Sequence, residues 1–159
     1  MILRDNFMIR TAHPEIYQEL QQKKKMFKLQ IHLFTAALVI GVLNKAKSQL
    51  SPHHDIIRLR QLQGNLKLYR DIINILSQII CRNKDERPCG AELLAYADGG
   101  LELIWEEYQS QGTLDLPRIV EEMKKKWSQR VPELLAIFKQ STYDKDAKVE
   151  QKKDTANES

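Results

Sequence analysis

Apolar residues recur along most of this chain at spacings of three and four, which is the period of an α-helix. The longest such stretch is MFKLQIHLFTAALVIGVLNKAK, residues 26–47. Its first half has a polar stripe at Lys28, His32 and Thr35, whereas residues 36–40 leave no polar face. A helix of this kind usually enters from the surface and ends in the core. We therefore expect residues 26–47 to form the central helix of the fold.

Other segments carry the same periodicity. A helix should begin at Pro14, because proline is favoured in the first turn. Residues 65–82 have the clearest amphipathic pattern, with Asn65 as a plausible N-cap, and a polar loop is expected at residues 83–90. A last helix should begin near Asp115 and be kinked or restarted at Pro132.

Residues 91–111 contain an apolar stripe that keeps its phase across Gly99 and Gly100. Two adjacent glycines would cost a helix interior about 2 kcal/mol relative to alanine. They either divide the segment into two helices, with Asp98 capping the second, or mark a point where a neighbouring backbone packs closely.

Two further segments are ambiguous. Phe7, Ile9 and Thr11 would share one side of an extended strand, and residues 56–62 fit either a strand or a helical turn. The fold class that follows is all-α: a compact bundle of about five helices, with a possible short strand near residues 5–11 or 56–62. Residues 1–138 would form a single helical domain, and residues 139–159, which have few apolar side chains, a disordered tail.

The composition narrows the class of protein. The chain has 25 Lys and Arg against 21 Asp and Glu, a mildly basic balance that permits an acidic partner without requiring one. The longest uncharged stretch is too short and too polar to span a membrane, and the amino terminus lacks the apolar region of a signal peptide. Cys81 and Cys89 lack the spacing of a zinc site, so we interpret them as reduced thiols. A soluble, cytoplasmic protein without a cofactor is expected.

Three groups of residues are candidates for catalysis or metal binding. Asp98, Glu102 and Glu106 are spaced like one face of a helix and could hold Mg²⁺, but the apolar stripe places them opposite the core, so a solvated acidic face is expected. The sequence His53-His54-Asp55 contains ligand types for zinc, yet adjacent histidines rarely chelate one ion, and a surface loop is the better interpretation. A thiol nucleophile would need a nearby base, and Cys81 ends an apolar helix. We expect no enzyme activity and no metal site.

Basic clusters are the remaining functional signal. If two of them met on one face, they could contact phosphates in a salt-sensitive way; otherwise they are helix-terminal lysines that keep the chain soluble. Arg58 and Arg60 form one basic cluster with Lys67 and Arg70. The candidate nucleic-acid-binding residues are Lys23, Lys24, Lys25, Lys28, Arg58, Arg60, Lys124, Lys125, Lys126 and Arg130.

The order of segments also resembles a known family. An apolar central helix is followed by AELLAYADGGLELIWEEYQ and a short LDL segment, and residues 96–103 (YADGGLEL) match the phrase that carries the resemblance. This pattern resembles the small accessory proteins associated with bacterial DNA phosphorothioation (Dnd) systems. The loop around His53 and the tail differ from that family's pattern.

The resemblance implies a non-catalytic accessory subunit of a bacterial DNA-modification or phage-defence system. Its partners would be other proteins of the complex and possibly DNA, and a homo-oligomer is possible. The alternative from the basic clusters is a stand-alone DNA-binding regulator.

Overall fold

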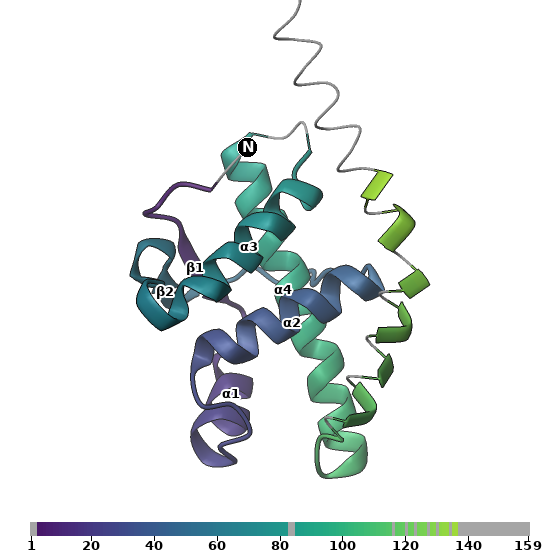
Figure 1. Cartoon of the computed structure of the whole chain (residues 1–159). Coiled ribbons are helices and arrows are strands. Elements are labelled where there is room, and N and C mark those ends of the chain that lie inside the picture. Colours follow the sequence, from purple (N-terminus) through teal and green to yellow (C-terminus); the bar gives the residue numbers. More distant parts are fainter. Residues whose placement is uncertain are drawn as a thin grey trace, which may run out of the picture.

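The computed structural model describes residues 3–82 and 85–115, and then 117–119, 121–122, 124–126, 128–129, 131–133 and 135–136. The chain is mainly helical, as its periodicity predicts, with one small two-stranded sheet (Figure 1). The elements in chain order are β1 (Met8–Thr11), α1 (Pro14–Tyr17), the π-helical turn η1 (Gln18–Lys23), α2 (Gln30–Asn44), β2 (His54–Arg58), the 3₁₀ turns η2 (Leu59–Gln61) and η3 (Gly64–Leu66), α3 (Lys67–Ile80) and α4 (Glu86–Gln111).

The centre of the fold is the crossing of α2 and α4 (Figure 1). Three glycines make this crossing close. A Cβ atom on Gly100 would lie 1.7 Å from the carbonyl oxygen of Ala37, and one on Gly41 would lie 1.9 Å from that of Tyr96. A Cβ on Gly99 would lie 2.2 Å from the carbonyl oxygen of Ala46, in the segment that leaves α2. The glycine pair therefore does not break the helix, and a neighbouring backbone does pack against it.

Helix α2 is enclosed on nearly all sides, in agreement with the apolar run at residues 36–40. Phe34, Ala37 and Leu38 are fully buried, and Thr35 donates a hydrogen bond from its hydroxyl to the carbonyl oxygen of Ile31. That bond satisfies the one polar side chain in the middle of the helix without an outside partner. The helix is shorter than the expected 26–47 at both ends, because residues 26–29 are not helical and the helix ends at Asn44.

The two ambiguous segments pair with each other in an antiparallel sheet, β1 against β2. Ile9 and Thr11 are buried, as their alternation predicts, and a register irregularity falls between Ile9 and Arg10. Arg10 and Asp55 form a cross-strand ion pair at 2.5 Å. The sheet therefore holds the amino-terminal segment beside the helices.

Helix α3 packs through Ile73, Leu76 and Ser77, which are buried. Its N-cap is Leu66 and not Asn65, because the turn η3 precedes the helix. Helix α4 begins at Glu86, several residues before the expected start, so the predicted polar loop at 83–90 is wrong from residue 86 onward. Pro88 lies in the first turn of α4, where the missing amide hydrogen has no intrahelical acceptor. The proposed tail, residues 139–159, lies outside the described residues.

Candidate functional site

The most polar part of the interior is a junction where the β1–α1 turn meets α4. Asp98 is only 1% exposed. One of its carboxylate oxygens accepts a hydrogen bond from the Thr11 hydroxyl at 2.6 Å, and the other accepts from the backbone amide of Ala12 at 2.9 Å. The Thr11 hydroxyl in turn accepts from the amide of His13 at 3.0 Å. Asp98 thus fixes the turn that leads from the sheet into α1.

His13 lies between two carboxylates from different elements. Its Nε2 is 2.9 Å from Oε1 of Glu102 on α4, and its Nδ1 is 3.2 Å from Oε1 of Glu15 in α1. The same oxygen of Glu102 accepts a 2.6 Å hydrogen bond from the hydroxyl of Ser48, which follows α2. Glu102 therefore joins the β1–α1 turn and the α2–β2 segment to α4.

This environment shifts the pKa of three groups. Burial lowers the pKa of His13. The hydrogen bonds to Glu102 and Glu15 and the nearby carboxylate charges raise it by more, so the pKa lies above the ordinary 6.5. Burial raises the pKa of Asp98, and the hydrogen bonds from Thr11 and Ala12 only partly offset that effect. Burial, with the charge of Asp98, also raises the pKa of Tyr17 well above 10.0. Each shift stabilises the protonated form relative to the same group in the unfolded chain.

The acid row expected from the sequence is divided by the fold. Asp98 is buried and not solvated, because the β1–α1 turn covers that side of α4, so the expectation for this residue is wrong. Glu102 faces His13 and Ser48, and only Glu106 is exposed. The carboxylates of Asp98 and Glu102 accept hydrogen bonds from Thr11, Ala12 and Ser48. Their role is therefore to hold the β1–α1 turn and the segment after α2 against α4.

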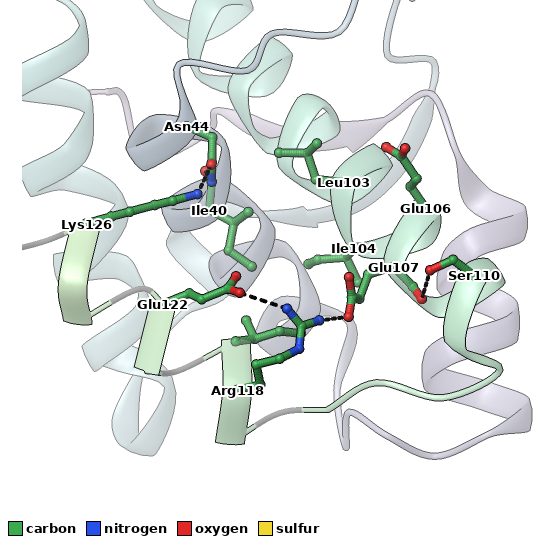
Figure 2. Close-up of a pocket in the computed structure, with 11 residues that line it drawn as sticks. Ile40, Asn44, Leu103, Ile104, Glu106, Glu107, Ser110, Arg118, Glu122 and Lys126 are labelled. Atoms are coloured by element: carbon green, nitrogen blue, oxygen red, sulfur yellow. Dashed lines mark hydrogen bonds and ion pairs between the residues drawn. The ribbon is translucent and has the colours of Figure 1, made fainter.

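A cleft of about 320 Å³ lies between the ends of α2 and α4 and the residues around 118–126 (Figure 2). Its wall is apolar at Ile40, Ile104 and Ile119. Arg118 crosses its mouth and forms ion pairs with Glu107 and with Glu122, while Lys126 bonds to Asn44 (Figure 2). The charged groups of the cleft largely neutralise one another, which leaves an apolar wall with a paired polar rim.

The candidate basic residues are dispersed over separate elements. The first cluster surrounds the turn from η1 to α2, where Lys23 pairs with Glu19 while Lys24, Lys25 and Lys28 are exposed. Arg58 and Arg60 lie at β2 and η2, on the sheet side of the molecule (Figure 1). The third cluster comprises Lys124, Lys125, Lys126 and Arg130, and of these Lys126 lines the cleft.

In the third cluster, Lys124 pairs with Glu121, and the side chain of Lys126 reaches Asn44 at the end of α2. Lys125 is exposed. Arg130 and Trp127 lie outside the described residues. The three clusters therefore lie on different segments of the chain. In the third, Lys124 and Lys126 are already paired with other side chains.

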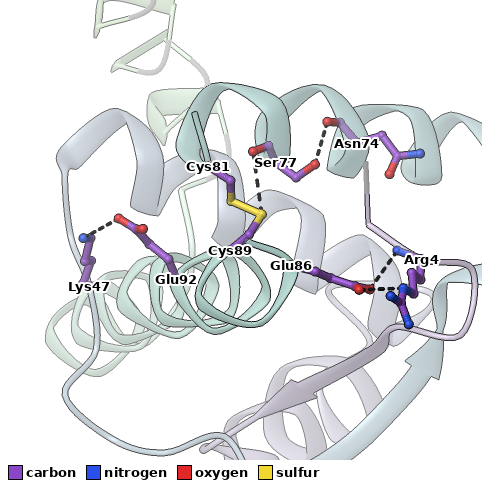
Figure 3. The surroundings of a disulfide bond; sticks show 8 residues. All are labelled: Arg4, Lys47, Asn74, Ser77, Cys81, Glu86, Cys89 and Glu92. Carbon is purple, nitrogen blue, oxygen red and sulfur yellow. Dashed lines mark hydrogen bonds and ion pairs between the residues drawn. A yellow bond between two sulfur atoms is a disulfide. The ribbon is translucent and has the colours of Figure 1, made fainter. Parts of the chain in front are cut away.

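Cys81 and Cys89 form a disulfide between the end of α3 and the first turn of α4 (Figure 3). The expectation of reduced thiols is therefore wrong. The chain reverses between the two helices, which brings the two Cα atoms to 5.0 Å, and both residues are buried. Ion pairs flank this end of α4: Arg4 contacts Glu86 at 2.7 Å, and Lys47 contacts Glu92 at 2.7 Å (Figure 3).

His53 and His54 are exposed. His53 lies in the loop before β2, as expected, whereas His54 and Asp55 belong to the strand. Among the residues that the structure describes, no group of three histidine, cysteine or acidic side chains is placed to hold a metal ion. His32 stacks against Tyr69 of α3, with ring centroids 4.9 Å apart, in a tilted arrangement. No helix in the described part of the chain is long and apolar enough to cross a membrane.

Helix α3 has a second apolar stripe on the side away from the core. It consists of Leu68, Ile75 and Ile79, and it borders Ile72, which packs partly against the core. Leu68 is 62% exposed and Ile75 is 56% exposed, while Ile72 and Ile79 are half-buried. Sequence reasoning assigned Ile72 and Ile79 to the core face and left Leu68 and Ile75 unassigned. The alternating exposure along the helix shows that the core covers only one side.

Sequence reasoning also missed His13, Thr11 and Ser48. Their partners, Asp98 and Glu102, were recognised as a pair four residues apart on a helix. The local signal for the other half was the run Thr11-Ala12-His13-Pro14, in which short polar side chains precede a helix-starting proline. Comparisons with protein-family models, with curated proteins and with solved structures found no match to this chain.

Proposed function

We propose that this chain is a non-catalytic accessory subunit that works by binding another protein through the outer stripe of α3. The observation that carries this proposal is the exposure of Leu68 and Ile75 on one line of a helix whose opposite face is already packed in the core. Apolar residues repeated at this spacing are the pattern by which one helix packs against another. Burying two such side chains would contribute a few kcal/mol to binding, at about 25 cal/mol per Å² of apolar surface.

The charge around the stripe favours a particular kind of partner. Arg58, Arg60 and Lys67 lie in the segments that lead into and begin α3, next to Leu68 in the chain. A partner helix with apolar residues at three-and-four spacing and acidic residues toward one end would match both features. Charge complementarity of this kind sets orientation and speeds association more than it adds affinity.

The polar junction supports a binding role over a catalytic one. His13, Asp98 and Glu102 are the side chains most suited to acid–base chemistry, and all three bond to other groups of the fold. A general base must lie within hydrogen-bond reach of a substrate proton. Here these side chains are hydrogen-bonded to one another, to Thr11 and Ser48, and to the backbone of the β1–α1 turn.

The identity of the partner is proposed from the family resemblance. The phrase at residues 96–103 lies in α4, and its two glycines are required by the close approach of Ala37 and Ala46. These residues therefore support a helix crossing like that of the family the chain resembles. The partner is inferred from the defence systems to which that family belongs. We propose that the partner is another protein of a bacterial DNA-modification or phage-defence complex, which places the chain in the cytoplasm.

Co-purification with the proteins of a phosphorothioation system tests this proposal. The wild-type chain and the double variant Leu68→Glu/Ile75→Glu would be expressed with those proteins and isolated by an affinity tag. We expect a system protein to elute with the wild type and to be lost at least tenfold in the double variant. The matched control is Leu50→Glu, which changes an equally exposed leucine (54%) in the α2–β2 segment and should retain the partner.

Three outcomes would contradict the proposal. A wild-type chain that elutes alone and monomeric has no such partner, and one that elutes only as a multiple of itself uses the stripe for self-association. Equal retention in both variants would place the contact elsewhere. Circular dichroism of the variants separates loss of binding from loss of folding.

A DNA-binding regulator is the second candidate, favoured by the turn between η1 and α2. Lys24, Lys25 and Lys28 are exposed there, and no ion pair holds them among the described residues. A gel-shift assay with duplex DNA at 50 and 200 mM salt tests it. The triple variant Lys24→Glu/Lys25→Glu/Lys28→Glu should lose a salt-sensitive shift, since each phosphate contact adds to the salt dependence. Absence of any shift in the wild type would remove this candidate.

A further inference from the structure

The side chain of His13 has a carboxylate at each ring nitrogen, a geometry that depends on its charge. Nε2 lies 2.9 Å from Glu102, and Nδ1 lies 3.2 Å from Glu15. A neutral imidazole has one N–H and one lone pair, so it can donate to only one of two carboxylates. The imidazolium has two N–H groups and satisfies both. The two contacts exist together as hydrogen bonds only when the ring carries its second proton.

We propose that His13 is a proton-controlled clamp, whose imidazolium ties the β1–α1 turn to α4 on one side and to α1 on the other. When the ring releases its proton, one of the two ties is lost, and a nitrogen lone pair then faces a carboxylate. This role is independent of the partner-binding function proposed above.

The clamp acts on a part of the chain with few other polar anchors. Residues 11–13 connect the sheet to α1, and α1 continues into η1 and the exposed lysine turn. Ile16, Tyr17 and Leu20 hold this arm to the core through apolar contacts, which do not depend on pH. The hydrogen bonds of Asp98 and of His13 are the polar connections between the turn and α4 in the described residues. Loss of the His13 tie therefore removes a directional contact at the base of the arm.

The titratable and polar groups near His13 come from each element packed against the turn. From the β2 side, His54 pairs with Thr11 across the sheet, and His53 donates its backbone amide to the carbonyl oxygen of Thr11. Glu15 and Tyr17 belong to α1, and Asp98 and Glu102 belong to α4. From the segment after α2, Ser48 bonds Glu102.

The cation nearest in that segment is Lys47. It bonds Glu92 and lies over the ring of Tyr96, so its charge is engaged there. The charges that act on the imidazole are therefore carboxylates. The side chain of His13 is 14% exposed, so water screens these interactions only in part.

The direction of the pH effect follows from these contacts. The pKa of His13 lies above the ordinary 6.5 in the folded chain. The stabilisation from the clamp is therefore complete below pH 6.5 and is lost as the pH rises through the folded pKa. The raised pKa of Asp98 has the same sign, and its window begins at 3.8. The variant His13→Gln, which leaves Asp98 in place, therefore separates the two contributions.

Two measurements on the full chain test the clamp. Nitrogen-15 NMR of the ring nitrogens should show a doubly protonated His13 with a titration midpoint above 6.5, and Glu102→Gln should lower that midpoint. Urea unfolding between pH 5.5 and 8.5 should show a several-fold rise in the unfolding equilibrium constant of the wild type. The variant His13→Gln should remove most of that rise. His54→Gln, which changes an exposed histidine, should leave the rise unchanged.

A midpoint at or below 6.5, or an equal pH dependence in the wild type and His13→Gln, would overturn the proposal. If His13→Gln does not fold, the NMR titration of the wild type and of Glu102→Gln decides the matter. An unchanged midpoint in Glu102→Gln would show that the carboxylate of Glu102 does not hold the proton on the ring.

Discussion

Helices α2 and α3 are both rich in apolar residues, but the fold uses them differently. Helix α2 has α4 across one side and other segments around it, so that nearly all its apolar side chains are buried. Helix α3 packs on one side through Ile73 and Leu76 and exposes Leu68 and Ile75 on the other. The comparison shows that apolar content alone does not identify a core helix. What matters is whether the chain supplies neighbours for every apolar face, and in the part of the chain that the structure describes α3 has them on only one side.

The largest expected effect concerns the close crossing that encloses α2. In Gly100→Ala the new Cβ would meet the carbonyl oxygen of Ala37, which belongs to a helix backbone and cannot rotate away. We expect a loss of about 4 kcal/mol in the free energy of unfolding, above the usual ~1–3 kcal/mol of overpacking, because the clash is with backbone. Urea denaturation measures it.

Gly112→Ala is the contrasting variant for this prediction. Gly112 has a left-handed backbone but open space around its Cβ position, so its substitution should cost only about 1 kcal/mol. Equal losses in the two glycine variants would contradict the role of the crossing.

The next effect compares the two faces of α3 with the same residue type. Ile73 is fully buried and Ile75 is 56% exposed, two positions apart on one helix. Ile73→Ala should destabilise the protein by about 3 kcal/mol, because it removes buried methyl groups and leaves a cavity. Ile75→Ala should change stability by no more than about 0.5 kcal/mol. Thermal unfolding of both variants measures the difference, and a large loss for Ile75→Ala would mean that the outer stripe is already covered.

A smaller effect is expected from the disulfide that joins α3 to α4. Replacing both Cys81 and Cys89 by serine removes a cross-link that closes a short loop. The chain-entropy model gives about 2.5 kcal/mol for a loop of this length. Urea unfolding of the wild type with and without a reductant should reproduce the loss, since the reductant opens the same bond. Alkylation of free thiols in intact cells, followed by mass spectrometry, measures how much of the bond forms where the protein works.

Several features could be predicted from the sequence because they depend on local pattern. The spacing of apolar residues determined the helical class, the burial of α2 and the alternation of Ile9 and Thr11 in β1. The glycine pair at 99 and 100 indicated either a break or a close backbone approach, and the structure selects the close approach. Each of these signals lies within a single segment, where a periodicity of two or 3.6 residues is readable.

The site depended on contacts between segments far apart in the chain. Thr11 and Asp98 are 87 positions apart, and His13 and Glu102 are 89 apart. A carboxylate on the polar side of a helix looks solvent-exposed until a distant turn covers it, so Asp98 was assigned to the wrong environment. The disulfide likewise needed the reversal between α3 and α4, which an early helix start at Glu86 makes possible.

The sequence by itself determined that the chain is mainly helical and where the apolar stripes lie along each helix, because both follow from the order of side chains along one segment. Only the tertiary structure decided which polar groups meet and which apolar face stays uncovered. These outcomes depend on where α4 and the β1–α1 turn lie relative to α2 and α3. That placement is set by the sum of many contacts, and no single stretch of the chain encodes it.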